Sequence, residues 1–363
     1  MAAPRFTALV RSLPATVPFV GPEAQERARG KAFKARIGAN ENAFGASPLA
    51  TDAMARAARG AWMYADPENH DLREALAAHH GIAPANIVVG EGIDGLLGYI
   101  ARMTIAPGVA VVTSHGAYPT FNYHVAGFGG ALTFVPYRDD HEDLEALAAT
   151  AHEHDASLVY LANPDNPMGT WHNAAAIERF IDALPASALL CLDEAYVDLA
   201  PHDTAPPLRT DDPRVIRLRT FSKAHGLAGL RIGYAIAEAS VAASFNKVRN
   251  HFGVNRIAQA GALASLNDSA HLAKLRGLNA EACRQINTIA RANGLIPLAS
   301  AANFVAIDCG RDGAFARAVL EGLIARDVFV RMPFVAPLDR CIRVTAAPAA
   351  DLAVFAQALP AAL

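Results

Sequence analysis

The sequence predicts an α/β fold with two parts: a large domain with a mostly parallel seven-stranded sheet between helices, and a smaller α/β C-terminal domain. Short apolar runs such as Ile87–Val89 and Leu158–Leu161 alternate with amphipathic helical patterns, as in parallel sheets covered on both faces. A length of 363 residues also favours two domains over one. Beyond Ala235 the pattern becomes mainly helical, which indicates where the second domain is built.

Residues 1–44 are expected to form an arm that belongs to the small domain and contacts a second subunit. This stretch is rich in Pro, Ala and Arg, and residues 22–29 have the pattern of a short helix. Ser47-Pro48 marks the next helix start, because proline suits the first helical position. Residues 71–80 repeat leucines at helical spacing and predict another helix.

The large domain is predicted to cover residues 45–255 and the small domain residues 256–363. Strand patterns of the large domain lie at residues 87–89, 109–112, 132–135, 158–161, 188–192 and 215–218. Its helices are expected from residue 92, near residue 119, and over residues 142–150 and 173–184. The small domain has helical patterns at residues 269–293, 312–326 and 350–361, and strand patterns at residues 304–307, 328–330 and 341–344.

Composition argues against several classes of protein. The chain is 52% hydrophobic and 18% charged, as in soluble globular enzymes. A net charge of −3 and the lack of a basic stripe argue against a nucleic-acid partner. No apolar run is long enough for a bilayer span, and the N-terminus lacks a signal-peptide core, so we expect a cytoplasmic protein without a membrane partner.

Cysteines and histidines give no sign of a metal site or a disulfide framework. The cysteines are far apart in the sequence and are expected to be free thiols. The close histidine pairs His79-His80 and His152/His154 lack companion ligands at zinc spacing. We therefore expect no metal, and predict that both pairs are solvated.

The segment Thr220–Tyr234 has the residue types of a cofactor anchor. Lys223 lies among small and apolar residues, which lower the pKa of an amine and suit it to form a Schiff base with an aldehyde. Ser222 and Arg231 are suited to hold an anion beside it. Together they describe an aldehyde cofactor with a phosphate, namely pyridoxal phosphate. On this segment alone, a loop lysine beside a glycine-rich turn is an equal alternative.

Residues that directly follow the predicted strands are the next candidates, because ligands bind at the carboxyl ends of parallel strands. The backbone N–H groups of Gly92, Ile93 and Asp94 open a helix and form a natural phosphate seat. Tyr118 could stack on a planar ring. The alternative for residues 92–94 is a tight strand-to-helix connection without a ligand, and the alternative for Tyr118 is a tyrosine of the core.

Two later strand ends carry more specific signals. Asn166 offers an amide that can donate to a phenolate-like oxygen, with an Asx turn as the alternative. Asp193 follows a very apolar strand, so its carboxylate should be buried and should need a cationic partner. A protonated pyridine nitrogen would supply that partner, and Tyr196 would then reach the 3-oxygen of the ring. An ion pair of Asp193 with a nearby arginine is the alternative.

Taken together, these segments resemble the fold type I pyridoxal-phosphate aminotransferases and, within them, the histidinol-phosphate aminotransferase group. The motifs are Asn-Pro-x-Asn-Pro-x-Gly-Thr at residues 163–170, Asp-Glu-Ala-Tyr at 193–196 and Ser-Lys-x-x-Gly-Leu-Ala-Gly-Leu-Arg-Ile-Gly-Tyr at 222–234. The resemblance extends to Ala39-Asn-Glu-Asn, Val254-Asn-Arg-Ile-Ala-Gln-Ala and Cys341-Ile-Arg-Val-Thr, and so covers nearly the whole chain.

The resemblance implies a role for each residue of the cofactor site. Lys223 would bond to the cofactor aldehyde and carry the substrate proton, and Asp193 would pair with the pyridine nitrogen. Tyr196 and Asn166 would contact the 3-oxygen, and Tyr118 would stack on the ring. The phosphate would be held by Thr220, Ser222, Arg231 and the backbone of Gly92, Ile93 and Asp94.

The resemblance also implies a homodimer with shared active sites and a set of substrate contacts. Tyr64 matches a tyrosine that reaches the phosphate of the neighbouring subunit. Arg343 matches the arginine that binds the substrate α-carboxylate, and Arg331 matches a second arginine near the distal group of the substrate.

The activity implied by the resemblance is transfer of an amino group between an amino donor, histidinol phosphate in histidine biosynthesis, and 2-oxoglutarate. Two departures bear on the substrate. Pro18-Phe19 stands where the family often has Pro-Tyr, and Phe19 cannot donate a hydrogen bond to a substrate phosphate. Met168 and His225 also replace the more usual Thr and Tyr or Phe. The alternatives are an aromatic amino acid aminotransferase and a phosphothreonine-type decarboxylase on the same fold.

Overall fold

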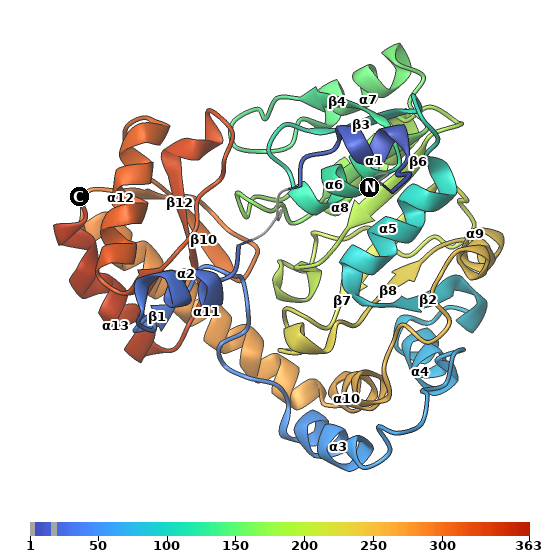
Figure 1. Cartoon of the computed structure of the whole chain (residues 1–363), viewed down its shortest axis with the longest axis horizontal. Coiled ribbons are helices and arrows are strands. Elements are labelled where there is room, and N and C mark those ends of the chain that lie inside the picture. The colour runs from blue at the N-terminus through green and yellow to red at the C-terminus, as the bar shows by residue number, and fades with distance from the viewer. Residues whose placement is uncertain (1–3, 16–19) are drawn as a thin grey trace.

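The computed structural model describes residues 4–15 and 20–363, and a seven-stranded sheet is its largest element (Figure 1). The strand order is β2-β8-β7-β6-β5-β3-β4, and only β8 runs antiparallel to its neighbours. The prediction of a mostly parallel seven-stranded sheet is therefore confirmed. The strands are β2 (Ile87–Gly90), β3 (Ala110–Ser114), β4 (Ala131–Val135), β5 (Leu158–Ala162), β6 (Leu189–Asp193), β7 (Val215–Thr220) and β8 (Gly233–Ile236).

Helices cover both faces of this sheet, and strand β5 shows why its sequence is apolar throughout. Leu158 and Tyr160 pack with α5 (Gly92–Thr104) and α6 (Pro119–Gly127), whereas Val159 and Leu161 pack with α7 (Leu144–Glu153) and α8 (Ala174–Ala183). Because successive side chains of a strand point to opposite faces, a strand covered on both sides buries every residue. We call the sheet and its covering helices the large lobe.

Three further helices close one end of the large lobe. Helix α3 (Pro48–Ala58) begins at Ser47, whose hydroxyl accepts hydrogen bonds from the backbone N–H groups of Leu49 and Ala50. It packs against α10 (Arg256–Leu266), and α10 also contacts α4 (His70–His80). Pro48 stands at the predicted helix start.

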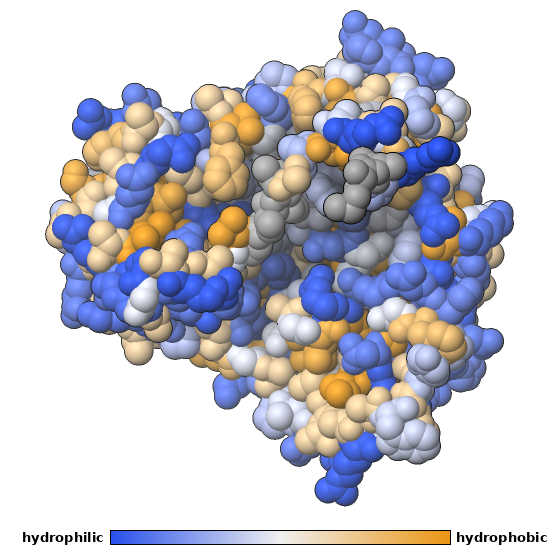
Figure 2. Space-filling model, viewed as in Figure 1, coloured by the Kyte–Doolittle hydropathy of each residue, from blue (hydrophilic) through white to orange (hydrophobic). Residues whose placement is uncertain are grey.

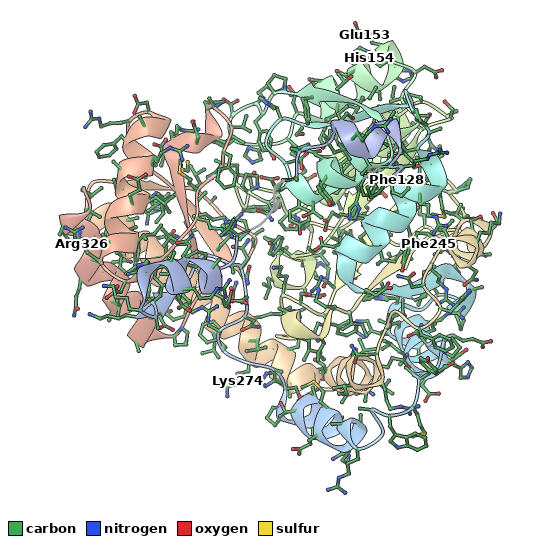
Figure 3. All side chains as sticks on the ribbon, viewed as in Figure 1. Phe128, Glu153, His154, Phe245, Lys274 and Arg326 are labelled. Atoms are coloured by element: carbon green, nitrogen blue, oxygen red, sulfur yellow. The ribbon has the colours of Figure 1, made fainter. Side chains whose placement is uncertain are left out.

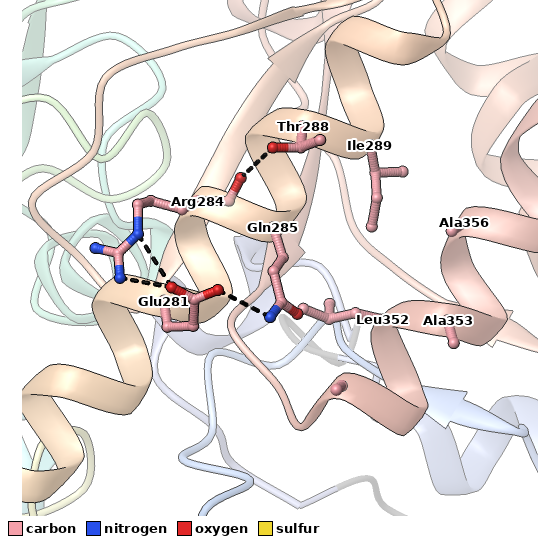
Figure 4. A pocket seen from close by; sticks show the side chains of 9 residues that line it. Glu281, Arg284, Gln285, Thr288, Ile289, Leu352, Ala353 and Ala356 are labelled. Atoms are coloured by element: carbon pink, nitrogen blue, oxygen red, sulfur yellow. Dashed lines mark hydrogen bonds and ion pairs between the residues drawn. The ribbon is translucent and has the colours of Figure 1, made fainter.

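The small lobe is a second, separate sheet with its own helices (Figure 1). Strand β10 (Phe304–Asp308) lies between β9 (Ile296–Pro297) and β12 (Cys341–Thr345), and both pairings are antiparallel. Helices α11 (Ser269–Ala292), α12 (Gly313–Ala325) and α13 (Ala349–Ala358) pack on it. Figure 3 labels Lys274 on α11, the long helix that connects the two lobes. Figure 4 shows a groove of about 510 Å³ between α11 and α13.

The N-terminal arm joins the small lobe through β-pairing. Strand β1 (Ala35–Arg36) pairs in parallel with β11 (Val328–Phe329), and α2 (Pro22–Arg29) precedes it at the predicted position. The backbone N–H of Thr345 then donates to the carbonyl oxygen of Ile37 at 2.8 Å. The arm therefore continues along β12 toward the large lobe.

Some elements were not predicted. Strand β8, at the end of the Thr220–Tyr234 segment, is only four residues long and begins with Gly233, so it shows no alternation of its own. It is held by its neighbours β2 and β7 on either side. Helix α1 (Ala8–Ser12) has no buried residue and makes its N-terminal cap with Thr7.

The two histidine pairs differ in their surroundings. His152 and His154 are exposed, and Figure 3 shows His154 at the outer end of α7. His80 instead lies half-buried, with its Nε2 2.9 Å from the hydroxyl of Tyr234, and burial lowers its pKa to about 3. The prediction that this pair is solvated is therefore wrong for His80, because His80 lies on the side of α4 that faces Tyr234 of β8. Within residues 4–15 and 20–363, no helix is long and apolar enough to cross a membrane.

A buried ion triad connects β6 to β7. The carboxylate of Glu194 is 2.5 Å from Nη2 of Arg217 and 2.9 Å from Nε of Arg219. Burial opposes the ionisation of Glu194, but the two guanidinium charges outweigh it and lower its pKa. Removing the anion would leave two buried cations without a partner.

Glu194→Gln is expected to lower the free energy of unfolding by about 3–5 kcal/mol, because the variant keeps both buried guanidinium groups and loses their counter-charge. Urea unfolding of the purified variant measures this loss. Glu178→Gln is the control, since the pair of Glu178 with Arg209 is exposed and should contribute no more than about 1 kcal/mol. Similar losses in the two variants would contradict the assigned importance of the triad.

Candidate active site

The candidate site lies where the carboxyl ends of the sheet strands of the large lobe face the small lobe and the arm. Figure 2 shows a hollow between the two lobes on this side of the molecule, with hydrophilic residues around it. Strand β6 ends at Asp193, β7 ends at Thr220, and β5 is followed by the loop of Asn166. The parallel order of these strands thus brings together residues that are far apart in sequence.

Lys223 lies at the centre of this arrangement. Its Nζ donates to the carbonyl oxygen of Asn40 at 2.9 Å and lies 5.7 Å from the centre of the Tyr196 ring. Burial lowers the pKa of the amine to about 8, and the charge of Arg343 adds to this effect. About a tenth of the amine is therefore unprotonated and nucleophilic at pH 7, far more than for an ordinary lysine.

Asp193 is a buried carboxylate without a cation of its own. Its Oδ2 accepts a hydrogen bond from the hydroxyl of Tyr160 at 2.8 Å, and its Oδ1 accepts one from the backbone N–H of Ala195 at 2.9 Å. No Lys, Arg or His of the described chain lies within ion-pair distance of it. Burial raises its pKa to about 6, although these two hydrogen bonds oppose the shift. The nearby arginines pair with Glu194 instead.

Tyr196 and Asn166 each make one side-chain hydrogen bond to a residue of the arm or of β12. The Tyr196 hydroxyl accepts a hydrogen bond from the side-chain amide of Asn40 at 3.0 Å, and burial raises its pKa to about 12. The side-chain oxygen of Asn166 accepts a hydrogen bond from Nη1 of Arg343 at 2.5 Å. This contact leaves the amide N–H₂ of Asn166 available as a donor.

An anion-binding cup is formed by the start of α5 and by Arg231. Glu91, at the N-cap of α5, makes no side-chain hydrogen bond to the first turn, so the N–H groups of Gly92, Ile93 and Asp94 lack a side-chain cap. Gly92 has φ +73°, and a Cβ at this position would lie 2.5 Å from Nη2 of Arg231. Glycine therefore lets the guanidinium approach the helix start.

The other residues predicted to hold the phosphate are close to this cup. Nη1 of Arg231 donates to the hydroxyl of Ser222 at 3.4 Å, and the backbone N–H of Ser222 donates to the hydroxyl of Thr220 at 3.0 Å. The carboxylate of Asp94 lies 3.7 Å from Arg231 and accepts a hydrogen bond from the hydroxyl of Tyr118 at 2.8 Å. The structure therefore brings Tyr118, Thr220, Ser222 and Arg231 into one region.

The two candidate substrate arginines are neighbours across a backbone bridge. The backbone N–H of Arg343 donates to the carbonyl oxygen of Arg331 at 2.6 Å. Burial and the charge of Arg343 lower the pKa of Arg331 to about 10, and burial also lowers the pKa of Arg343. The two arginines thus stand at neighbouring backbone positions, and the arginine side chain is well suited to bind a carboxylate or a phosphate.

Two predicted site residues are not part of this cluster. Tyr64 lies on the loop after α3, is 77% exposed, and has its ring against Phe252 at a centroid distance of 4.5 Å. Phe19 lies outside the described residues.

Asn40 and Tyr160 are site residues that sequence reasoning missed. Asn40 has φ +54° and connects Lys223, Tyr196 and Thr345, whose hydroxyl accepts from the backbone N–H of Asn40 at 3.1 Å. The sequence marks Asn40 only through the motif Ala39-Asn-Glu-Asn, and this motif does not indicate which residues Asn40 contacts. Tyr160 gave no signal at all, because it reads as one more apolar residue of a buried strand.

Comparison with known proteins agrees with this fold. Residues 34–359 match the family model described as aminotransferase class I and II. The chain therefore belongs to the class I and II aminotransferases.

Several relatives of this chain are histidinol-phosphate aminotransferases. The chain is 34% identical to a histidinol-phosphate aminotransferase of Moorella thermoacetica over 98% of this chain and 92% of the relative. It is 39% identical to a histidinol-phosphate aminotransferase of Anaeromyxobacter sp. over 88% and 89% of the two chains.

Solved structures give the same result. A histidinol-phosphate aminotransferase from Sinorhizobium meliloti, solved in complex with pyridoxal-5'-phosphate, is 54% identical, with a TM-score of 0.97 over 99% of this chain and 98% of that chain. An aspartate aminotransferase from Thermus thermophilus, at 20% identity and a TM-score of 0.84, covers 99% of this chain and 100% of that chain and shares the fold.

The hydrogen bond from Tyr160 to Asp193 leads to a prediction about pH. Between about pH 4 and pH 6 the folded chain binds more protons at Asp193 than the unfolded chain, so this residue makes the free energy of unfolding fall as pH rises. Tyr160→Phe should raise the pKa of Asp193 further and extend that fall above pH 6. In ligand-free protein we expect a loss of about 2 kcal/mol at pH 8 and a smaller loss at pH 5.

Urea unfolding at the two pH values measures the effect, and Tyr123→Phe is the matched control because Tyr123 is exposed. An equal loss in the free energy of unfolding at pH 5 and pH 8 would show that Tyr160 contributes through packing and not through its hydrogen bond to Asp193.

Proposed function

We propose that this protein is an aminotransferase that moves the amino group of histidinol phosphate to 2-oxoglutarate, a reaction of histidine biosynthesis. The observation that carries the proposal is that one site contains both an amine of lowered pKa, Lys223, and a buried carboxylate without a cation, Asp193. The substrate assignment is supported by the relatives and by the neighbouring backbone positions of Arg331 and Arg343.

The cofactor is pyridoxal 5'-phosphate, the ligand in the structure of the Sinorhizobium meliloti relative. The residues of this chain fit it: a nucleophilic amine, an unpaired buried carboxylate, and an uncapped helix start beside Arg231. When bound, it supplies an aldehyde that bonds to an amine and a pyridinium ring that accepts the electron pair left when the substrate Cα loses its proton. Asp193 would hold the ring nitrogen, and Gly92, Ser222 and Arg231 the phosphate.

Lys223 performs the proton transfer in the proposed reaction. When its Nζ is not bonded to the cofactor, the lowered pKa of about 8 suits this amine to remove a proton from the substrate Cα. Asn40 keeps this nitrogen within the site through the 2.9 Å hydrogen bond from Nζ to its carbonyl oxygen. Asp193 contributes by remaining ionised, which the hydrogen bonds from Tyr160 and Ala195 favour.

Tyr196 and Asn166 orient the bound ring in this proposal. The Tyr196 hydroxyl remains protonated at neutral pH and can donate to the ring 3-oxygen, and the Asn166 amide can donate from the other side. Tyr118 is proposed to stack on the ring.

Arg343 and Arg331 bind the anionic ends of both substrates in this proposal. Histidinol phosphate has no carboxylate, so its phosphate would take the guanidinium site that the 2-oxoglutarate carboxylate takes in the second half-reaction. The planar fork of an arginine suits both groups.

We also propose that the protein acts as a homodimer in the cytoplasm. Tyr64, Trp62 and Phe252 are large exposed side chains, and Tyr64 would reach the phosphate in the neighbouring subunit. The free thiols of all four cysteines support a reducing compartment. The division into an arm (1–44), a large domain (45–255) and a small domain (256–363) stays a prediction, which the separation of the seven-stranded sheet from the two small sheets supports.

A panel of amino donors with 2-oxoglutarate tests the function. We expect kcat/KM for histidinol phosphate to exceed that for phenylalanine by about 10²-fold or more, because its phosphate offers the Arg343 guanidinium a more highly charged group than the carboxylate of phenylalanine does. Glutamate formation measures transamination, and carbon dioxide release is measured in parallel.

Preference for phenylalanine would identify an aromatic amino acid aminotransferase instead. Carbon dioxide as the main product would identify a decarboxylase and overturn the proposal. Arg343→Lys serves as the matched variant, since lysine keeps the positive charge but lacks the planar pair of donors. It should weaken the binding of both anionic substrates alike.

A further inference from the structure

An ion pair outside the site described above joins the large lobe to the small lobe. Asp140 lies in the turn between β4 and α7, and Arg340 directly precedes β12. Nη2 of Arg340 donates to Oδ1 of Asp140 at 2.9 Å and to its Oδ2 at 2.8 Å. Both side chains are mostly buried, with exposed fractions of 24% for Arg340 and 22% for Asp140. A charge-assisted contact that is shielded from water in this way is stronger than an exposed surface pair.

Arg340 also has a partner within the small lobe. Its Nε donates to Oδ2 of Asp308 at 2.7 Å, and Asp308 is the last residue of β10, the neighbour of β12 in the sheet. The contact with Asp308 therefore holds Arg340 to its own sheet, whereas the contact with Asp140 connects that sheet to the other lobe. Because the two contacts use different carboxylates, each can be removed without the other.

The turn that carries Asp140 is fixed to the loop of Asn166. Asp140 has φ +63°, a left-handed conformation that its surroundings must hold in place. Its carbonyl oxygen accepts a hydrogen bond from the hydroxyl of Thr170 at 2.7 Å. The carbonyl oxygen of Thr170 in turn accepts one from the backbone N–H of Asp165 at 2.9 Å, which closes the loop of Asn166. Asp140 and Asn166 are therefore held at fixed positions within the large lobe.

These contacts form a closed ring that crosses between the lobes twice. Arg343 follows Arg340 on β12, and its Nη1 donates to the side-chain oxygen of Asn166 at 2.5 Å. The first crossing is the contact of Arg343 with Asn166, at the candidate site. The second crossing is the ion pair of Arg340 with Asp140. A substrate anion on the Arg343 guanidinium competes with Asn166 for the same donors, but it does not compete for those of Arg340.

We propose that Asp140 and Arg340 are positioning residues, which hold β12 against the large lobe and so keep Arg343 within reach of the anionic end of a bound substrate. This inference rests on the proposed function, which assigns the substrate anion to Arg343. When the anion takes donors from the contact with Asn166, the ion pair keeps the separation of the two lobes that anion binding requires. Neither Asp140 nor Arg340 contacts the substrate itself.

The charge of Asp140 makes the direction of the effect decisive. Removal of this carboxylate makes the local potential more positive, and this change alone would strengthen the binding of an anion to Arg343. Loss of the ion pair releases β12 from the large lobe and weakens the same binding. The proposal requires that the second effect exceed the first.

Calorimetric titration of the cofactor-loaded protein with 2-oxoglutarate tests the proposal. In Asp140→Asn we expect the Kd of 2-oxoglutarate to rise about threefold to tenfold, with the visible absorbance of the bound cofactor unchanged. In turnover, the KM for 2-oxoglutarate should rise by the same factor while kcat changes by less than about twofold. Arg340→Lys keeps the positive charge but cannot contact Asp140 and Asp308 together, so it should raise the Kd by a smaller factor.

Two control variants separate the crossing from stability and from charge. Asp308→Asn removes the partner of the same arginine inside the small lobe, so it should lower the urea midpoint of unfolding but leave the Kd within about twofold of the wild-type value. Asp139→Asn removes the exposed carboxylate next to Asp140, which has no ion pair within residues 4–15 and 20–363, and should bind 2-oxoglutarate like the wild type. Urea unfolding of each variant checks that it is folded.

A Kd for Asp140→Asn that equals the wild-type value or falls below it would overturn the inference and leave the proposed function standing. Equal increases of Kd in Asp140→Asn and Asp308→Asn would also overturn it, because Arg340 would then act only through the fold of the small lobe. A wild-type protein that carries the cofactor but does not bind 2-oxoglutarate at all would contradict the proposed function itself, and this inference with it.

Discussion

The chemistry of this site depends on a buried carboxylate that the protein leaves without a cation. Asp193 and Glu194 are adjacent in sequence and both buried, yet only Glu194 has cationic partners. Arg217 and Arg219 compensate Glu194 and lower its pKa, whereas Asp193 receives two neutral donors and its pKa rises. An unbalanced buried charge is unfavourable for the protein alone, and it becomes favourable when a cationic ring nitrogen binds there.

The remaining site residues are arranged around this charge by the topology of the fold. Parallel strands place Asp193, Thr220 and the loop of Asn166 at one edge of the sheet. The arm and β12 supply the opposite wall, where Asn40 contacts Lys223 and Tyr196 and Arg343 contacts Asn166. The residues proposed to hold the cofactor therefore come mainly from the large lobe, and those proposed to bind the substrate anion come from the small lobe. Relative movement of the lobes would change how tightly a substrate is enclosed.

Much of this arrangement was predictable from the sequence, because the strands of the large lobe are apolar runs and the polar residues after them stand out. Lys223, Asp193, Asn166 and Arg231 were found in this way, and the structure brings them together. Strand β8 was missed because four residues within a glycine-rich motif show no alternation.

Residues whose importance comes only from three-dimensional contacts could not be predicted. Asn40 is 183 residues away from Lys223 in sequence, and Tyr160 is an apolar-looking member of a buried strand until its hydroxyl is seen against Asp193. Glu142 precedes a predicted helix as an ordinary polar residue, and only the fold reveals that it is buried.

The central claim is that Lys223 is the amine that bonds to the cofactor aldehyde. Borohydride reduction of the cofactor-loaded protein, followed by proteolysis and mass spectrometry of the peptides, tests it most directly. The account predicts that the reduced pyridoxal phosphate adduct is found on the peptide that contains Lys223, and that Lys223→Ala protein carries no adduct there. An adduct on Lys31, Lys34, Lys247 or Lys274 in place of Lys223 would contradict the account.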